Sequence, residues 1–261
     1  MLQKEVLYVN SVPNTNTQVG LYSYAFGGYP FCGGTLIAPN WVLTAAHCVT
    51  PLFNCNDPPV GTLFNLTELT GQKLVIIAGD HDYTVKTAFK KGRWVQDVIL
   101  HPNTPKDELM AYDVALLRIE PKLKRSVQVQ YACLPEKDLE LPTSHWCYFT
   151  GWGLVKDASI PGRDMRKTTK LMEGASPTIP TEICKIAEIE VNRERHGCLQ
   201  GTMTSFAPGD SGGGVHCKDL NGQWVVYGII GMAHGSGFGH YALFARIGYY
   251  TEWIKKIIRE N

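Results

Sequence analysis

Ser211 lies in a glycine-rich stretch, residues 207–217, with the sequence APGDSGGGVHC. Two interpretations of this stretch are open. Gly and Ser are common in turns, because Gly tolerates positive φ angles and Ser forms local hydrogen bonds. Alternatively, the Ser211 hydroxyl is a nucleophile on a tight loop. A serine hydroxyl is a poor nucleophile near neutral pH, so the second interpretation requires a base elsewhere in the chain.

His47 and Asp113 are the residues that can complete such a site. His47 lies in TAAHC (44–48) and Asp113 in AYDVALL (111–117), each beside an apolar run. By itself, a His beside a Cys is typical of a surface residue or of a core residue whose polar atoms are hydrogen-bonded. An Asp before a strand is by itself typical of a cap or turn residue. Together they supply an imidazole with a pKa of about 6.5 and a carboxylate that fixes its tautomer. The combination predicts nucleophilic acyl transfer by Ser211.

A rival interpretation comes from the Gly-x-Ser-x-Gly pattern around Ser211, which also marks the nucleophile turn of α/β-hydrolases. That fold needs an acid and a His after the serine, and Asp219 with His234 or His240 could supply them. It also needs alternating strands and helices, which the sequence lacks. The chain order His, Asp, Ser is instead that of the chymotrypsin arrangement.

The sequence predicts that β-strands position these three residues. Short apolar runs recur between Gly, Pro and Asn clusters, which is typical of an all-β sandwich or barrel. The helical spacing of apolar residues in Tyr249–Asn261 predicts one terminal amphipathic helix. A weak boundary between two groups of strands lies near residues 121–135. The strand-like runs are 41–43, 73–78, 97–100, 114–119, 148–149 and 224–230.

Composition narrows the class of protein further. The 261 residues suit one large all-β domain or two small ones, and 44% are hydrophobic. The net charge of +1 gives no reason to expect nucleic acid or a membrane surface as a partner. The eight cysteines include no C-x-x-C pair, which favours disulfides in an oxidising compartment over a metal site or free thiols. The first ten residues lack the apolar segment of a signal peptide. The sequon Asn65-Leu66-Thr67 fits secretion and glycosylation at Asn65.

The chain resembles the trypsin/chymotrypsin-like serine proteases from about residue 18 to its end. The resemblance implies two six-stranded antiparallel β-barrels, within 18–120 and 135–247, and a C-terminal helix at 248–261, in one peptidase domain of residues 1–261. It implies protein or peptide substrates, a protein protease inhibitor as a further partner, a monomer, and no cofactor or metal. The matching segments are FCGGTLI (31–37), WVLTAAHC (41–48), DVALL (113–117), TGWG (150–153), GDSGG (209–213) and Trp253-Ile254.

The resemblance also implies a role for each residue of the site. Ser211 attacks the scissile carbonyl, His47 moves the proton, and Asp113 orients His47. The backbone N–H groups of Gly209 and Ser211 form the oxyanion hole. The rate should rise as His47 loses its proton, around pH 6–7.

The activation segment departs from the family pattern. Activated relatives usually begin Ile-Val-Gly-Gly, and the new amino terminus pairs with the acid before the nucleophile, which here is Asp210. The nearest match is Tyr8-Val9-Asn10-Ser11, so cleavage after Leu7 would be required. We therefore expect either a zymogen or a different way of satisfying Asp210, because a buried unpaired carboxylate is costly.

The substrate cleft departs as well. Gly231-Met232-Ala233 stands where the family usually has Ser-Trp-Gly, and Gly214 replaces a usual Pro. The loop 204–208 lacks a usual Cys, whose partner is also missing near Ser236. The family's pocket floor corresponds to Ser205, which carries no charge, so a preference for Arg or Lys is not expected. Ala233, Ala242 and Phe206 narrow the pocket, which favours Ala, Val, Leu or Met before the cleaved bond.

Cysteine pairing and calcium follow from the same resemblance. It pairs Cys32 with Cys48, Cys147 with Cys217, and Cys184 with Cys198. Cys55 and Cys133 either pair with each other, which we favour, or serve an absent segment. The loop 79–82 (GDHD) begins like the calcium loop of some relatives, but its later acidic ligands appear as Thr87 and Lys90, with Lys91 adjacent. We expect no calcium site, because Ca²⁺ needs six to eight oxygen ligands.

A second hypothesis comes from another class. The departures fit a catalytically silent protease homologue that acts as a binding or regulatory protein. The complete triad favours the enzyme over this alternative, and labelling by a fluorophosphonate separates the two.

Overall fold

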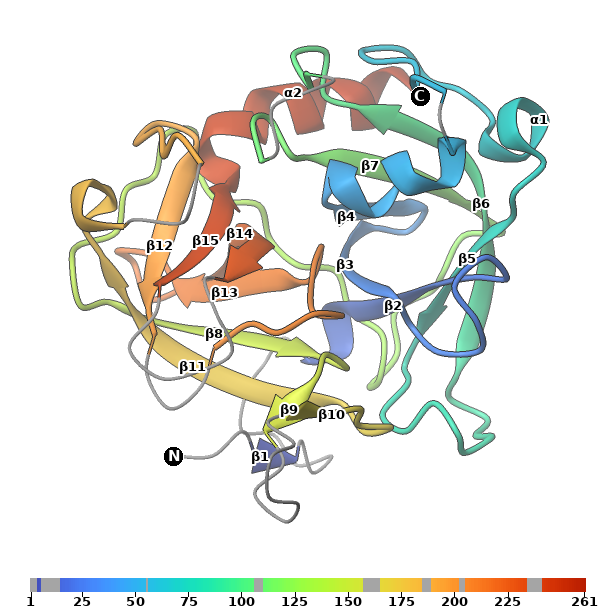
Figure 1. Ribbon diagram of the computed structural model, residues 1–261, viewed down its shortest axis with the longest axis horizontal. Coiled ribbons are helices and arrows are strands. Elements are labelled where there is room, and N and C mark those ends of the chain that lie inside the picture. Colours follow the sequence, from blue (N-terminus) through green and yellow to red (C-terminus); the bar gives the residue numbers. More distant parts are fainter. Residues whose placement is uncertain are drawn as a thin grey trace.

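The structure, a computed structural model, describes residues 4–5, 15–54, 56–105, 110–156, 165–184, 189–201, 205–233 and 241–261. Two closed antiparallel barrels lie side by side, and the chain completes the first before it begins the second (Figure 1). The prediction of two six-stranded barrels followed by a C-terminal helix is therefore confirmed.

The first barrel closes in the order β2-β3-β4-β7-β6-β5. In each strand, buried apolar residues occur either at every second position or in a continuous run. These side chains pack together in the interior of the barrel. Strand β6 is longer than its apolar run predicts, because its first half is polar and exposed. The strands are β2 (Gln18–Ser23), β3 (Cys32–Ala38), β4 (Trp41–Thr44), β5 (Leu74–Ala78), β6 (Lys91–Leu100) and β7 (Ala115–Glu120).

The second barrel closes because β8 pairs with both β13 and β11. Its core holds the Cys147–Cys217 disulfide and a group of aromatic and aliphatic side chains. The strands are β8 (Trp146–Gly151), β11 (Met172–Ile179), β12 (His196–Gln200), β13 (Gly214–Lys218), β14 (Trp224–Ala233) and β15 (Tyr241–Arg246). Outside the barrel, β1 (Lys4–Glu5) pairs with β11, and β9 (Val155–Lys156) pairs with β10 (Met165–Arg166).

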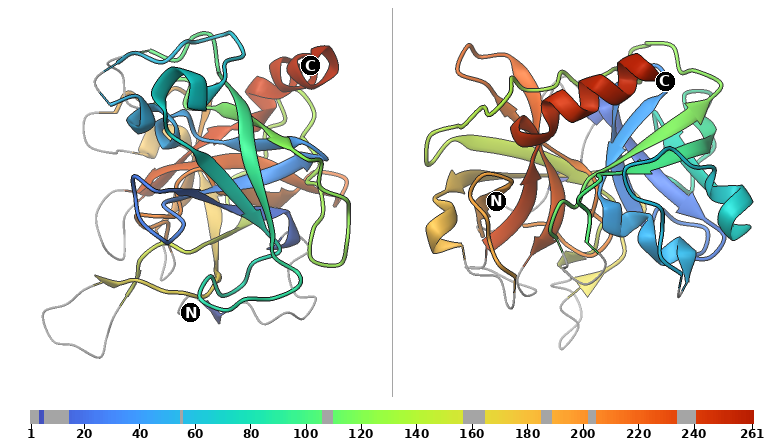
Figure 2. Two further views of the ribbon diagram at one scale, coloured as in Figure 1. Left: turned by 90° about the vertical axis from the view of Figure 1, so that its right-hand side faces the viewer. Right: turned by 90° about the horizontal axis from the view of Figure 1, so that it is seen from above.

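Helix α2 (Ile247–Glu260) follows the second barrel but packs against the core of the first. Figure 2 shows it lying across the top of both barrels. Tyr250, Ile254 and Ile257 are buried at helical spacing. The helix therefore fixes the two barrels relative to each other. It begins one residue before the expected start at 248.

Short helical segments occur where the sequence showed no helical period. The helix α1 (Leu66–Thr70) is capped by Asn65, whose Oδ1 accepts a hydrogen bond from Glu68 N at 3.0 Å, and it ends at Gly71 with φ +71°. The 3₁₀ segments are η1 (Thr15–Thr17), η2 (Ala46–Cys48), η3 (Thr50–Phe53) and η4 (Thr181–Ile183). Segment η2 matters most, because it carries His47.

The two barrels approach closely at glycines. Gly33 N donates a hydrogen bond of 2.7 Å to Ser211 O, and a Cβ on Gly33 would lie 3.1 Å from Gly213 Cα. Side chains at these positions would separate the backbones. Gly33 therefore belongs to the contact that sets the second barrel's serine loop against the first barrel.

Candidate active site

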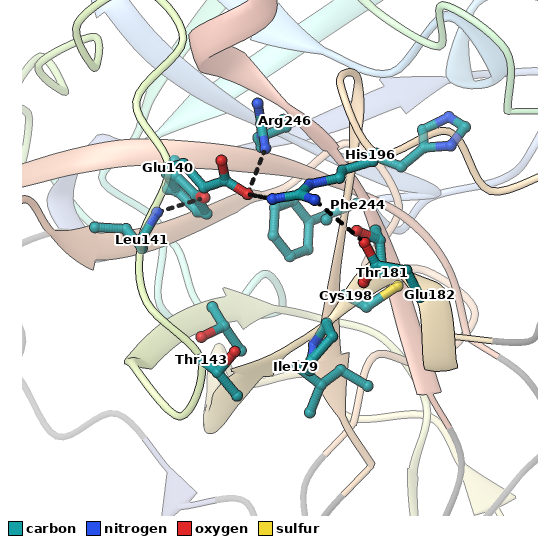
Figure 3. Close-up of a pocket in the computed structure, with 15 residues that line it drawn as sticks. Glu140, Leu141, Thr143, Ile179, Thr181, Glu182, His196, Cys198, Phe244 and Arg246 are labelled. Atoms are coloured by element: carbon teal, nitrogen blue, oxygen red, sulfur yellow. Dashed lines mark hydrogen bonds and ion pairs between the residues drawn. The ribbon is translucent and has the colours of Figure 1, made fainter.

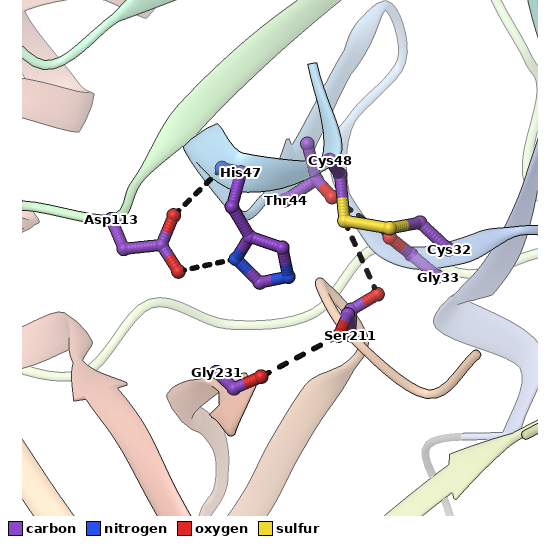
Figure 4. The surroundings of a disulfide bond; sticks show 8 residues. All are labelled: Cys32, Gly33, Thr44, His47, Cys48, Asp113, Ser211 and Gly231. Atoms are coloured by element: carbon purple, nitrogen blue, oxygen red, sulfur yellow. Dashed lines mark hydrogen bonds and ion pairs between the residues drawn. A yellow bond between two sulfur atoms is a disulfide. The ribbon is translucent and has the colours of Figure 1, made fainter. Parts of the chain in front are cut away.

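His47 and Asp113 form an ion pair on the first barrel. His47 follows β4 on the turn η2, and Asp113 lies two residues before β7, the strand that pairs with β4. Asp113 Oδ2 lies 2.6 Å from His47 Nδ1, and Oδ1 accepts a hydrogen bond from His47 N at 2.8 Å (Figure 4). Both carboxylate oxygens thus fix the position of His47, one through its ring and one through its backbone.

Burial strengthens this pair. The Asp113 side chain is 6% exposed and the His47 side chain 24% exposed. Burial alone lowers the pKa of His47, but the charge and hydrogen bond of Asp113 outweigh it, so the pKa is raised above 6.5. Burial raises the pKa of Asp113, yet the bonds from His47 and Ala46 keep it below its usual range. Asp113 therefore stays ionised across the pH range in which His47 titrates.

A pH profile should show this coupling. The base is active only when neutral, so kcat/KM should rise with pH through the pKa of free-enzyme His47, with a midpoint above the ordinary value of 6.5. The measurement is kcat/KM on an uncharged peptide substrate, with the His47 ring titrated by NMR as the control. A midpoint well below 6.5, or one that differs from the NMR titration, would contradict the assignment.

Ser211 lies on the turn between Ala207 and Gly214 of the second barrel, facing His47. Figure 4 shows the edge of the His47 ring opposite Asp113 turned towards Ser211. Ser211 Oγ donates to Gly231 O over 3.4 Å, and the backbone of Ser211 is held by the Gly33 bond. Catalytic hydrogen bonds are often long before substrate binds.

The backbone of the serine turn suits the expected oxyanion hole. Gly209 has φ +102°, which a side chain rarely adopts, and a Cβ there would lie 3.0 Å from Gly153 Cα. The carbonyl of Pro208 accepts a hydrogen bond from Leu154 N at 3.0 Å. Because the C=O and N–H of a trans peptide point in opposite directions, the Gly209 N–H points away from Leu154.

Asp210 lies buried beneath this turn. It is 3% exposed, and its carboxylate accepts hydrogen bonds from Gly153 N at 2.8 Å and from Ala207 N at 3.0 Å. No cation pairs with it among the residues that the structure describes. Burial raises its pKa to about 6, against the opposing effect of the two backbone bonds. Tyr8 to Ser11, the expected activation segment, lie outside the described residues.

The expected substrate-binding residues fall in two environments. Ala233 and Ala242 are directly paired across β14 and β15, so their methyl groups share one face of the sheet. Phe206 is buried and packs edge-on against Phe149, with ring centres 4.6 Å apart. Ser205, Gly231, Met232 and Ala233 are partly exposed. Phe206 thus belongs to the core of the barrel that underlies Ser205.

Three disulfides join the pairs that the resemblance implies. They are Cys32–Cys48, Cys147–Cys217 and Cys184–Cys198. Cys133 is an exposed free cysteine, and Cys55 lies outside the described residues, so their pairing stays a prediction. The thiol sulfurs nearest His47 are both consumed by the first disulfide, so this His-Cys-Cys group offers no thiolate to a metal.

The GDHD loop binds the side-chain ammonium group of Lys90, which lies further along the chain. Lys90 Nζ lies 2.9 Å from Asp80 Oδ1 and also donates to Asp82 O at 2.6 Å. The Asp80 side chain is 1% exposed. Burial raises the pKa of Asp80, and the hydrogen bond and charge of Lys90 oppose that rise. The ammonium group therefore occupies the space between the carboxylate and carbonyl that a calcium ion would need.

Replacing Lys90 should expose this role. Lys90→Ala leaves Asp80 buried without its cation, which should lower the free energy of unfolding by about 3–5 kcal/mol. Lys91→Ala is the matched control, because Lys91 is exposed and its described hydrogen bond goes to a backbone oxygen, Ala88 O. Thermal unfolding with millimolar calcium or chelator should give equal Tm values for the unmodified protein. A rise in Tm with calcium that a chelator reverses would contradict this assignment.

The cavity shown in Figure 3 contains none of the expected catalytic residues. Its volume is about 180 Å³, and it lies at one end of the second barrel. Arg193 bridges Glu140 and Glu182 across its rim, at 3.1 and 3.5 Å. Arg246 adds a contact with Glu140 at 3.8 Å. Among the lining residues that the structure describes, these charged groups are paired with one another.

Two buried residues beside the site carried no signal in the sequence. Met110 and His196 lie in segments without a recognisable motif and contact each other across 86 positions of sequence. Only the folded chain brings them together. None of the helices that the structure describes is long and apolar enough to cross a membrane.

Two closed antiparallel barrels, with a His–Asp pair on one facing a serine turn on the other, define the chymotrypsin-like class of fold. The family model described as Trypsin matches residues 10–254. Chymotrypsin-like elastase family member 1 of Canis lupus familiaris and of Homo sapiens are each 30% identical over 261 residues, covering 97% of this chain and 90% of the relative. The same protein of Rattus norvegicus is 30% identical over 258 residues, covering 95% and 86%. The chain belongs to the trypsin family.

Proposed function

We propose that the protein is a serine endopeptidase that acts through an acyl-enzyme. The observation that carries this proposal is the buried Asp113–His47 pair opposite Ser211. His47 Nδ1 donates to Asp113, so Nε2 is the unprotonated atom and is free to accept a proton. The proposal goes further than family membership, because related folds can lose activity through small changes.

The chemistry follows from this tautomer. His47 Nε2 takes the Ser211 hydroxyl proton while Oγ bonds to the scissile carbonyl carbon. The developing oxyanion accepts hydrogen bonds from the N–H groups of Gly209 and Ser211. His47 then returns the proton to the leaving amine, the peptide C–N bond breaks, and an acyl-enzyme remains. Water, deprotonated by the same nitrogen, releases the acid and regenerates Ser211.

A fluorophosphonate probe tests activation of Ser211 directly. The purified protein should be labelled at Ser211 and lose its peptidase activity in proportion to labelling. Thermally unfolded protein is the control, since the reaction needs an assembled site. Absence of labelling in folded, processed protein would favour the silent homologue. The observation that supports it is that no charged group among the described residues pairs with Asp210.

We further propose a secreted protein. Three disulfides in one domain suit an oxidising compartment. Glycosylation at Asn65 is part of this proposal. Its Oδ1 caps α1, and its Nδ2 is the atom that a glycan would modify.

The pocket should favour apolar side chains of small or medium size. Ser205 provides no charge, and the paired methyl groups of Ala233 and Ala242 narrow the wall. In a library with varied P1 residues, cleavage should occur after Ala, Val, Leu or Met, with about 1–3 kcal/mol of discrimination for each methylene. The relatives named chymotrypsin-like elastase family member 1 are 30% identical over 261 residues, which supports the proposal.

A matched variant makes this test sharper. Ala233→Gly combined with Ala242→Gly removes both methyl groups and should raise kcat/KM for Phe and Tyr substrates relative to Ala substrates. Main cleavage after Arg or Lys by the unmodified protein would refute the uncharged pocket. A preference of the unmodified protein for Phe or Tyr at P1 would refute the proposal that Ala233 and Ala242 narrow the pocket.

A further inference from the structure

His196, the first residue of β12, reaches across the barrel boundary to the loop that ends at Asp113. It is 2% exposed, and its Nε2 lies 3.1 Å from Met110 O. Its Nδ1 lies 3.0 Å from Asn192 N. A backbone N–H can only donate, so Nδ1 is the acceptor and Nε2 carries the hydrogen that it donates to Met110 O. The bonding partners thus determine the tautomer of His196.

The loop that receives this bond has an unusual backbone. Met110 has φ +73° and Tyr112 has φ +50°, a region that residues other than glycine rarely occupy. They lie three residues and one residue before Asp113. Such conformations persist only where surrounding contacts hold them. The backbone of the Asp113 loop therefore depends on contacts from outside the loop.

Those contacts come in part from the second barrel. The Arg195 guanidinium lies 4.5 Å from the centre of the Tyr112 ring, next to the His196 bond to Met110. The Met110 side chain is 6% exposed and packs with the Cys184–Cys198 disulfide and Leu243. Arg195 and His196, which are consecutive in the chain, thus contact the two loop residues that have positive φ angles.

Met110 also lies against the strand beside Ser211. A Cβ on Gly231 would come within 2.9 Å of Met110 Sδ, so the glycine leaves room for the thioether. The carbonyl of the same Gly231 accepts the Ser211 hydroxyl bond. A displacement of Met110 would therefore change the positions of both Asp113 and Gly231.

We propose that His196 is a positioning residue, which holds Asp113 in register with His47 by donating a hydrogen bond to Met110 O. His196 touches neither the expected substrate nor the reacting atoms. It acts through the loop, and it ties the acid of the first barrel to the barrel that carries the nucleophile. The catalytic consequence rests on the proposed peptidase function, whereas the geometric consequence for the His47–Asp113 pair does not.

Two polar substitutions of His196 distinguish the hydrogen bond to Met110 O from the other contacts of the side chain. In His196→Asn, the amide oxygen can still accept from Asn192 N, but the shorter side chain cannot reach Met110 O. In His196→Gln, the amide nitrogen reaches the depth of Nε2 and can still donate to Met110 O. His145→Leu on the same barrel is the control, because no hydrogen bond of the His145 ring is described.

The expected result is a split between the two variants. His196→Asn should lower kcat by about 10–100-fold with little change in KM, since a small misplacement of a catalytic group has effects of this size. His196→Gln should retain kcat within a few-fold. The pKa of His47 should fall in the Asn variant, because the proximity of Asp113 holds it up.

NMR makes the test independent of turnover. The hydrogen between His47 Nδ1 and Asp113 gives a far-downfield proton resonance, which should move or broaden in His196→Asn and be preserved in His196→Gln and His145→Leu. If the protein proves to lack peptidase activity, this resonance and the His47 titration still decide the positioning role. An unchanged resonance and His47 pKa in folded His196→Asn would overturn the proposal, and so would equal changes in the Asn and Gln variants.

Discussion

Replacing Ser211 with alanine, or His47 with alanine, is expected to lower kcat by about 10⁵–10⁶-fold. The first change removes the attacking oxygen, and the second removes the only imidazole held against Asp113 among the residues that the structure describes. Neither substitution adds bulk, and the Gly33–Ser211 backbone bond does not involve the serine side chain. The measurement is single-substrate kinetics on purified protein whose Tm matches that of the unmodified chain.

The double variant provides the internal control. Nucleophile and base act as one unit, so Ser211→Ala with His47→Ala should be little slower than either single variant. Losses that multiply would show that the two residues act independently. Peptidase activity that persists unchanged in purified Ser211→Ala would place the nucleophile elsewhere.

Replacing Asp113 with asparagine should cost about 10⁴-fold in kcat with little change in fold. Asparagine can keep an oxygen on the backbone N–H of His47, because that N–H donates to Oδ1 in the present structure at 2.8 Å. Its NH₂ group then faces His47 Nδ1 and can only donate. The ring must accept there, so its hydrogen moves to Nε2 and the base is lost.

The control for this variant is a titration and not a second substitution. The pKa of His47 should fall in Asp113→Asn, because both the charge and the hydrogen bond that raise it are weakened. NMR of the His47 ring measures this shift without turnover. Activity close to that of the unmodified protein, together with an unshifted His47, would show that Asp113 does not orient the ring.

The sequence predicts the fold class and singles out the segments of His47, Asp113 and Ser211, because those features depend on local patterns. Short apolar runs between turn signals predict strands such as β5 and β7, and short motifs surround His47, Asp113 and Ser211. The start of β6 was not predicted, because Lys91 to Gln96 is mostly exposed and keeps no apolar period. Strand pairing with β5 and β7 extends it instead.

The supporting contacts of the site could not be predicted for a different reason. The bond between His196 and Met110 joins residues 86 positions apart, and neither belongs to a pattern with its neighbours. The hydrogen bond from Gly153 N to the Asp210 carboxylate likewise joins residues 57 positions apart, although each lies in a motif of its own. Such contacts depend on the packing of whole elements, which residue spacing does not encode.

The division of the site between two barrels has a consequence for the cell that makes the protein. His47 and Asp113 lie within the first 120 residues of the chain. The contacts from Arg195 and His196 to the Asp113 loop come only with the second barrel, and so does Ser211. Its turn is then fixed by contact with Gly33. A chain that is still being synthesised, or one whose barrels have not yet docked, therefore lacks both the nucleophile and the contacts that position its acid. Under the proposed function, hydrolysis begins only after folding is complete, which protects unfinished neighbouring chains during biosynthesis.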